Sequence, residues 1–89
     1  MFIANKTLST KWTAIAEVNT GDEFLIQNLS SEEVFCYCVL NEKPSEDVIG
    51  GYIDPHQQLS FKKVSGDLYM KKTKGDEYVG RICIEKVEA

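Results

Sequence analysis

GDEFLIQNLSSEEVFCYCVL, residues 21–40, is the stretch that decides the fold. It holds two runs, residues 23–28 and 33–40, that alternate side chains between two faces and are rich in aromatic and branched residues. Such runs predict β-strands. The polar segment between them, residues 29–32, is typical of a turn. We expect the rest of the chain to supply further short strands that pack against this pair.

The second of these strands is apolar on both faces. One face carries Val34, Cys36, Cys38 and Leu40, and the other carries Phe35, Tyr37 and Val39. A strand of this kind is usually central and covered on both sides, or covered on one side by a neighbouring subunit. We therefore expect this strand either between two sheets or in a subunit interface.

Before this stretch, residues 1–11 are polar with scattered apolar positions, which predicts a flexible N-terminal arm or a weak edge strand. Residues 12–18 alternate, with Trp12, Ala14, Ala16 and Val18 on one face. The alternation favours a half-buried strand, and the two alanines leave a helix as the competing interpretation. Trp12 is expected to anchor the core.

After residue 40, the polar and acidic segment 41–50 predicts a long loop interrupted by Pro44. A short apolar step at residues 52–53 leads into a turn at Asp54-Pro55. Residues 58–63 and 68–72 alternate on either side of a Ser-Gly-Asp turn and are expected to form a hairpin. Residues 73–77 predict a second polar loop, and residues 81–87 a last strand. The whole pattern predicts a single all-β domain over residues 1–89: a small antiparallel β-sandwich or barrel of six to seven short strands.

Size and charge limit the function. The chain has 89 residues, 43% of them hydrophobic, and a net charge of −4. An acidic surface disfavours binding to nucleic acid or to an anionic membrane. We find neither a signal peptide nor a transmembrane segment in the sequence, so we expect a protein that is cytoplasmic when made or is carried in a particle. Small β domains often bury further surface by association, which makes a homo-oligomer one of the expected states.

The cysteines are the first candidates for chemistry. There are three, an odd number, which argues against a disulfide framework. Cys36 and Cys38 share a strand face, and with Cys83 and His56 they form the only set that resembles metal ligands. Zinc-binding pairs usually come from turns, whereas this pair lies within an apolar strand, so packing is the favoured role. Cys83 with His56 is the weaker hypothesis of a nucleophile with its base. We expect no catalytic, cofactor or metal site.

Charged side chains supply the remaining candidates. A basic cluster of Lys62, Lys63, Lys71, Lys72 and Lys74 would gather at the base of the expected hairpin and face an acidic partner. The favoured alternative is a charged face that protects a sheet edge. The acidic pairs at residues 32–33, 46–47 and 76–77 are expected to solvate turns. Neither of the common phosphate-binding glycine patterns is present.

Six strand and turn motifs follow one another along the chain: Trp12 to Ala16, Gly21 to Asn28, Val34 to Leu40, Gly51 to Pro55, Ser65 to Tyr69 and Gly80 to Glu85. Taken in this order, they resemble small virion-associated proteins of tailed phages and prophages. They are turn and strand signatures, and they cover most of the chain after Lys11. The chain departs from the pattern in its cysteines and in its many lysines and glutamates.

The resemblance implies a non-enzymatic structural subunit of a phage particle, such as a decoration, head-fibre or tail-associated protein. Such subunits are typically symmetric oligomers that bind a capsid or tail lattice and require no cofactor. Two other functions remain open. One is a carbohydrate- or receptor-binding module in which Trp12, Tyr37, Tyr52 and Tyr69 supply stacking surfaces. The other is a small phage-encoded regulator that binds a host protein.

Overall fold

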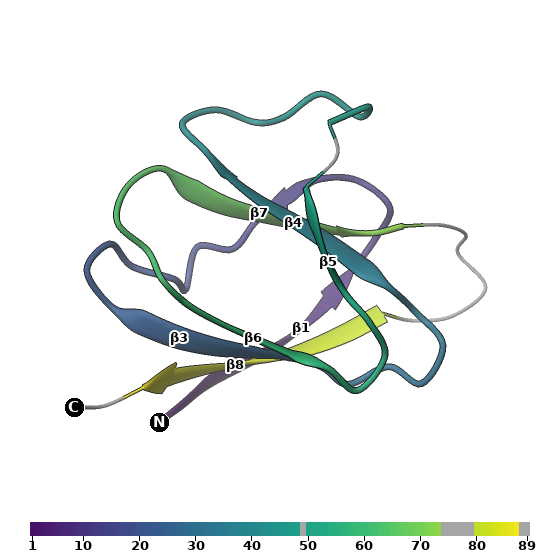
Figure 1. Ribbon diagram of the computed structural model, residues 1–89, viewed down its shortest axis with the longest axis horizontal. Coiled ribbons are helices and arrows are strands. Elements are labelled where there is room, and N and C mark those ends of the chain that lie inside the picture. The colour runs from purple at the N-terminus through teal and green to yellow at the C-terminus, as the bar shows by residue number, and fades with distance from the viewer. Residues whose placement is uncertain (49, 74–79, 88–89) are drawn as a thin grey trace.

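Two antiparallel sheets face each other in the computed structural model, which describes residues 1–48, 50–73 and 80–87 (Figure 1). One sheet has the order β1-β8-β3-β6 and the other has the order β2-β7-β4-β5. The strands are β1 (Phe2–Leu8), β2 (Thr13–Ala14), β3 (Glu23–Asn28), β4 (Phe35–Leu40), β5 (Gly51–Ile53), β6 (Gln58–Lys62), β7 (Asp67–Lys72) and β8 (Gly80–Val87). The predicted all-β antiparallel sandwich is confirmed. It has more strands than expected because the N-terminal segment is a strand. The described part of the chain contains no helix that could cross a lipid bilayer.

The core lies between the two sheets and follows the period-two alternation of the strands. Phe24 and Ile26 of β3 and Ile82 and Ile84 of β8 are almost fully buried from one side. From the other sheet, the main contributors are Phe35, Ile53, Leu68 and Met70. Burial of an aliphatic or aromatic side chain stabilises a fold by about 1.5–3 kcal/mol, so these residues supply most of the driving force.

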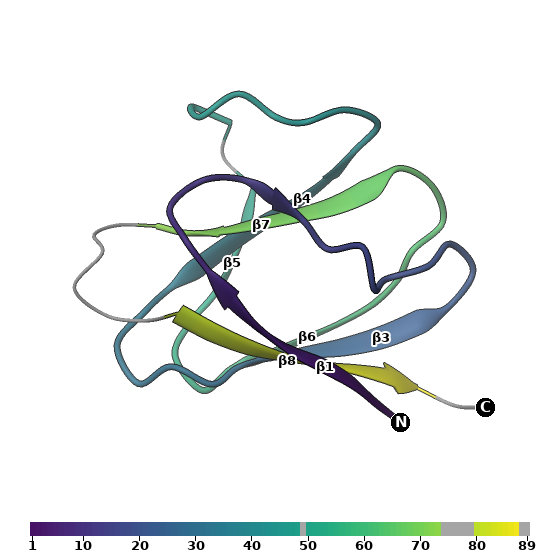
Figure 2. The same cartoon turned by 180° about the vertical axis from the view of Figure 1, so that it is seen from behind.

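One long side of the sandwich is closed by the N-terminal segment. β1 pairs with β8 along its length, so residues 2–8 are the edge strand that was one of the two expectations for this region. The chain then crosses to the other sheet, where Lys72 N–H donates to the carbonyl of Ser9 (2.8 Å) and β2 pairs with β7. Figure 2 shows this crossing from behind. Lys6 Nζ also contacts Glu17 Oε1 (2.9 Å), which holds the segment after β2 beside β1.

The expected hairpin between residues 58–63 and 68–72 is wrong. β6 pairs with β3 in one sheet, whereas β7 pairs with β4 in the other. The physical reason is the core: the apolar side chains of β6 and β7 face each other across the sandwich, which requires the two strands to belong to different layers. Gly66, with φ of +75°, makes the change of direction between them. β3 and β4 are likewise in opposite sheets and are joined by a connection between the layers.

The alternation expected over residues 12–18 is also wrong beyond Ala14. β2 contains only Thr13 and Ala14, and a turn follows in which Val18 N–H donates to the carbonyl of Ile15 (3.3 Å). Burial then recurs at every third position, at Trp12, Ile15 and Val18, because the turn rotates the chain. Ala14 and Ala16, which were expected on the buried face, are exposed. The competing helix does not form here either.

Candidate binding groove

The outer face of the β2-β7-β4-β5 sheet carries a second apolar cluster. Trp12, Cys36 and Tyr69 are buried in it, and Cys38 packs against it. Cys36 is paired with Lys71 of β7 on one side and with Tyr52 of β5 on the other. Paired residues share a face of a sheet, so these side chains project on the side away from the sandwich core. On β4, this outer face carries Cys36 and Cys38.

The loop between β4 and β5, described over residues 41–48 and residue 50, covers this face. Trp12 Nε1–H donates to the carbonyl of Ser45 (3.0 Å), and Lys71 Nζ donates to the carbonyl of Glu46 (2.9 Å). The Lys71 ammonium also lies 4.6 Å from the centre of the Trp12 ring, a cation–π contact. Pro44, which belongs to this loop, is buried. Figure 1 shows the loop at the top, beyond the ends of β4 and β7.

These contacts explain the two apolar faces of the strand after residue 33. β4 is central in its sheet, with β7 and β5 as neighbours. Phe35 faces the core between the sheets, and Cys36 faces the outer cluster under the loop. The second cover is therefore a loop of the same chain, which was neither of the two expected covers. The end of the strand is left open, with Val39 and Leu40 42% and 39% exposed.

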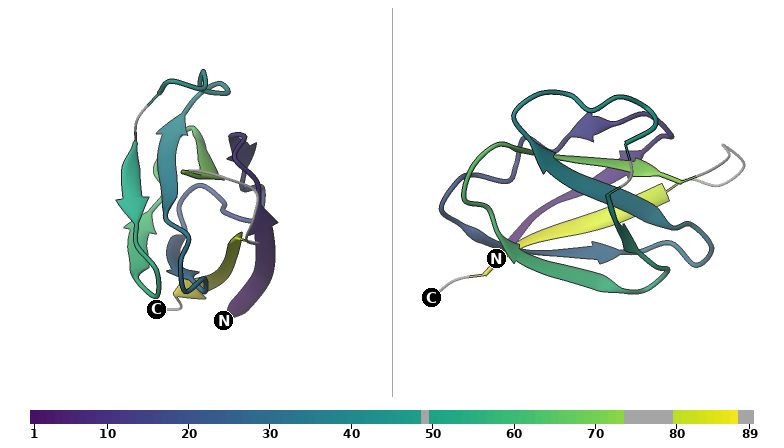
Figure 3. Two further views of the ribbon diagram at one scale, coloured as in Figure 1. Left: turned by 90° about the vertical axis from the view of Figure 1, so that its right-hand side faces the viewer. Right: turned by 45° about the horizontal axis from the view of Figure 1, so that its top comes forward.

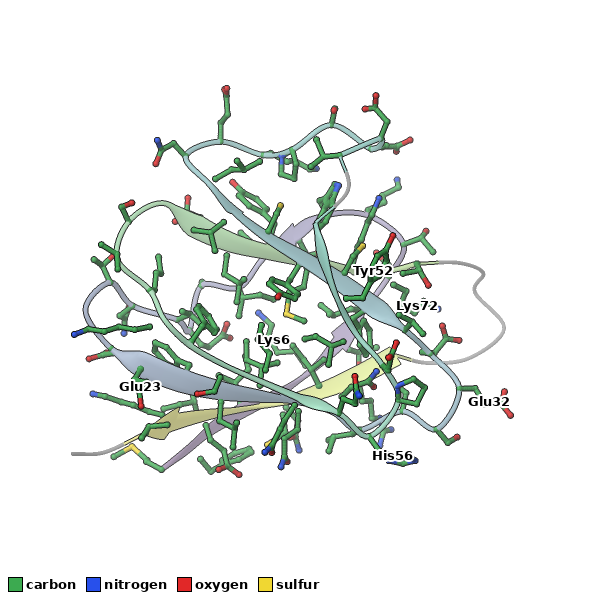
Figure 4. The ribbon with its side chains drawn as sticks, in the orientation of Figure 1. Lys6, Glu23, Glu32, Tyr52, His56 and Lys72 are labelled. Atoms are coloured by element: carbon green, nitrogen blue, oxygen red, sulfur yellow. The ribbon has the colours of Figure 1, made fainter. Side chains whose placement is uncertain are left out.

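A groove of about 320 Å³ lies between the loop and β5. Its lining comprises Cys36, Glu46, Asp47, Val48, Tyr52, Lys71 and Thr73. Tyr52 is 57% exposed and stands on β5 beside the groove (Figure 4). Ser45 Oγ–H donates to the Asp47 carboxylate (2.7 Å), and this hydrogen bond holds the pKa of Asp47 below its usual value. The groove thus combines an apolar floor, an exposed aromatic ring and acidic groups on the loop.

The thiol in the groove, that of Cys36, has a raised pKa. Burial raises the pKa of Cys36, although the nearby Lys71 ammonium opposes the shift. Burial also raises the pKa of Cys38 and of Cys83. A cysteine attacks as its thiolate, and a raised pKa lowers the thiolate fraction at neutral pH. These shifts therefore disfavour attack by the three thiols.

This gives a pH prediction. The folded protein raises the pKa of all three thiols above 9.0, so it binds more protons than the unfolded chain once pH exceeds that value. The thiol contribution to stability is complete below this pH and is lost as pH rises through the folded pKa values. We expect urea unfolding to show a steeper loss of stability above pH 9 in the natural protein than in a variant with all cysteines changed to alanine. Equal slopes in the two proteins would contradict the raised pKa values of the thiols.

The possible metal ligands from the sequence are divided between the two sheets. His56 lies in the exposed turn that connects β5 to β6 (Figure 4), whereas Cys36 and Cys38 lie on the outer face of the β2-β7-β4-β5 sheet. Cys83 is on β8, in the sheet opposite β4. Among the residues that the structure describes, no three His, Cys, Asp or Glu side chains are grouped so that they could hold a metal ion.

The basic cluster expected at the base of the hairpin does not form, because its strands belong to different sheets. Lys63 is buried and donates to the carbonyl of Val18 (3.2 Å), and Lys72 is 4% exposed. Lys71 lies against Trp12 and lines the groove. Lys62 is exposed on β6, and Lys74 lies outside the described residues. The acidic pair at residues 76–77 also lies outside them.

The groove itself was missed at the level of sequence. Its residues come from β4, from the loop, from β5, and from β7 and the residue after it, and their association depends on the order of strands in the sheet. One signal was available: the apolar outer residues of the second strand, followed by a loop with a proline, indicate a loop that folds back over that strand. Comparisons with known protein families, with curated proteins and with solved structures found no match.

Proposed function

We propose that this protein is a non-enzymatic interaction protein that binds a protein partner in the groove, as a structural subunit of a phage or prophage particle. The observation that carries the binding proposal is the open groove beside the exposed ring of Tyr52. The assignment to a particle, as a decoration or head- or tail-associated subunit, is supported by the resemblance of the strand and turn motifs.

The chemistry of the groove suggests the kind of segment that it accepts. Tyr52 offers an apolar and hydrogen-bonding surface, which is typical of residues at the centre of protein interfaces. Glu46 and Asp47 add negative charge on the loop, and the whole chain is acidic. We infer a partner segment with an apolar side chain next to a lysine or an arginine.

A carbohydrate-binding module is less well supported. Stacking on a sugar requires exposed ring faces, but Trp12 is 4% and Tyr69 8% exposed. The Trp12 ring is also in contact with Lys71. Among Trp12, Tyr37, Tyr52 and Tyr69, only Tyr52 is well exposed.

The proposal is tested by co-sedimentation of the purified protein with phage heads and with phage tails from a strain that carries its gene. We expect the natural protein to sediment with one of these and Tyr52→Lys to lose at least about tenfold in affinity, because an interface aromatic of this kind contributes roughly 2 kcal/mol. Val64→Lys is the matched control. It makes the same change of charge at a residue that is 76% exposed in the connection between β6 and β7.

Sedimentation with neither structure would overturn the assignment to a particle. Binding to a host protein, with the same loss of affinity in Tyr52→Lys, would support the groove as the binding site and favour the role of a regulator. Equal binding by Tyr52→Lys and Val64→Lys would overturn the groove as the binding site.

A further inference from the structure

The side of the sandwich opposite β1 remains open. β6 is an edge strand there, and among the described strands it pairs only with β3 (Figure 3). Its five residues, QLSFK, include one charge, Lys62, and no proline. Leu59 and Phe61 face the core but are only half-buried, and none of the described strands lies beyond β6 to cover them. Natural proteins usually protect such an edge with charges, proline or bulges along its length.

Hydrogen bonds at the two ends of the β3–β6 ladder establish which groups of β6 point outward. Asn28 N–H donates to the carbonyl of Gln57 (2.9 Å), and Lys63 N–H donates to the carbonyl of Asp22 (3.2 Å). In an antiparallel pair every second residue bonds to the neighbour, so the bonded positions are 57, 59, 61 and 63. The backbone groups that face the open side belong to Gln58, Ser60 and Lys62.

We propose that two copies of this chain associate through β6, antiparallel about a two-fold axis at Ser60, to form one continuous sheet. Among the symmetric registers, this one pairs each of the five residues of β6 with a residue of β6 in the second copy. It brings the outward groups of Ser60 onto Ser60 of the second copy, and those of Gln58 onto Lys62, for about six backbone hydrogen bonds.

The side chains are complementary in this register. On the core face, Leu59 of one copy lies opposite Phe61 of the other, an aliphatic–aromatic pair that covers the half-buried rim of the core. On the outer face, each Lys62 has Glu23 of its own β3 on one side and the uncharged Gln58 of the second copy on the other. No like charges are opposed. A two-fold axis at Lys62 would instead place the two ammonium groups opposite each other.

This association does not depend on the proposed partner of the groove, because β6 and the groove belong to different sheets. The test is sedimentation equilibrium over concentrations on the order of 1–300 µM, where mass action resolves weak dimers. We expect the natural protein to rise from 10.1 kDa toward twice that mass. A monomer across the whole range would overturn the proposal.

Ser60→Pro tests the edge directly. Its N–H faces away from β3, so proline removes a hydrogen bond to the second copy and none within the sheet. We expect a folded monomer, with a far-UV circular dichroism spectrum and unfolding midpoint close to those of the natural monomer. A folded Ser60→Pro variant that dimerises like the natural protein would overturn the proposal.

Two substitutions at Gln58 test the register without altering the backbone. Gln58→Glu places a carboxylate opposite Lys62 of the second copy at both ends of the pairing, and Gln58→Lys places an ammonium there. Opposed charges differ by about 0.2–1 kcal/mol for each pair, so we expect Gln58→Glu to tighten and Gln58→Lys to weaken the dimer by about 2- to 30-fold. Equal affinities in the two variants would overturn this register.

Discussion

Asn28→Asp is expected to destabilise the protein by at least about 3 kcal/mol at pH 7, a large part of the 5–15 kcal/mol that holds a small domain together. Asn28 is 1% exposed. Its Nδ2 donates to the carbonyls of Glu33 (2.7 Å) and Ile53 (3.1 Å), and its Oδ1 accepts from Ser30 N–H (2.9 Å). An aspartate would turn two donor contacts into oxygen–oxygen repulsions within the buried interior.

The Asn28 amide contributes strongly to stability because of its position in the sandwich. Asn28 ends β3 in one sheet, whereas Ile53 ends β5 in the other sheet and Glu33 precedes β4. One buried side chain therefore connects the two layers and orders the turn through Ser30. Loss of a partner leaves buried carbonyls unsatisfied, at about 1–3 kcal/mol for each group.

The pH dependence of the Asn28→Asp variant distinguishes the loss of these buried hydrogen bonds from a simple loss of packing. Burial raises the pKa of a carboxyl group, so the folded variant would bind a proton more tightly than the unfolded chain. Stability relative to the natural protein should recover as pH falls from 7 toward 4, where the protonated acid can donate one hydrogen bond. Urea unfolding at several pH values measures this recovery.

Gln27→Glu is the matched control, because it makes the same change in a neighbouring amide that bonds to Gln58 on the exposed face. We expect it to change the free energy of unfolding by less than about 0.5 kcal/mol. An Asn28→Asp variant within about 1 kcal/mol of the natural protein at pH 7, or one whose deficit does not change with pH, would contradict the role of the amide.

Local alternation was a sound guide to most of the strands. Residues 23–28 and 81–87 lie in strands as expected, and the alternation holds, since Phe24, Ile26, Ile82 and Ile84 are all almost fully buried. The same alternation places Asn28 inward after Phe24 and Ile26. An inward amide at the end of an apolar face was thus a visible sign of a buried polar link, and the sequence interpretation did not use it.

The pairing of strands was not accessible from local patterns. A turn such as Ser65-Gly66-Asp67 has the same composition whether it joins neighbours in one sheet or crosses between two sheets, since Gly66 supplies positive φ in either case. The choice depends on which apolar faces must meet across the core. The lining of the groove and the free edge of β6 follow from that choice, so their residues could not be assigned before the strand order was known, although the sequence did offer a sign of the loop over the second strand.

Phe35→Ala is expected to lower the free energy of unfolding by about 3–5 kcal/mol, measured by urea denaturation. Phe35 is fully buried at the start of β4 and belongs to the core between the sheets. Its removal loses the burial of an aromatic ring and leaves a cavity that a small domain can only partly fill. Phe2→Ala, at a residue that is 59% exposed, is the control and should change stability by less than about 1 kcal/mol.

A second substitution tests where the ring lies. A Cβ added at Gly80 would be 2.7 Å from the Phe35 ring and 2.8 Å from Lys72 Cδ, closer than packed atoms allow, so Gly80→Ala alone should destabilise by about 1–3 kcal/mol. In the Phe35→Ala background the clash with the ring is gone and only the contact with the Lys72 side chain is left, so the cost of the methyl group should fall. The coupling in this double-mutant cycle is therefore expected to reach about 1–3 kcal/mol. Additive effects would mean that Phe35 does not pack over Gly80, and the contact between the start of β4 and the start of β8 would have to be rejected.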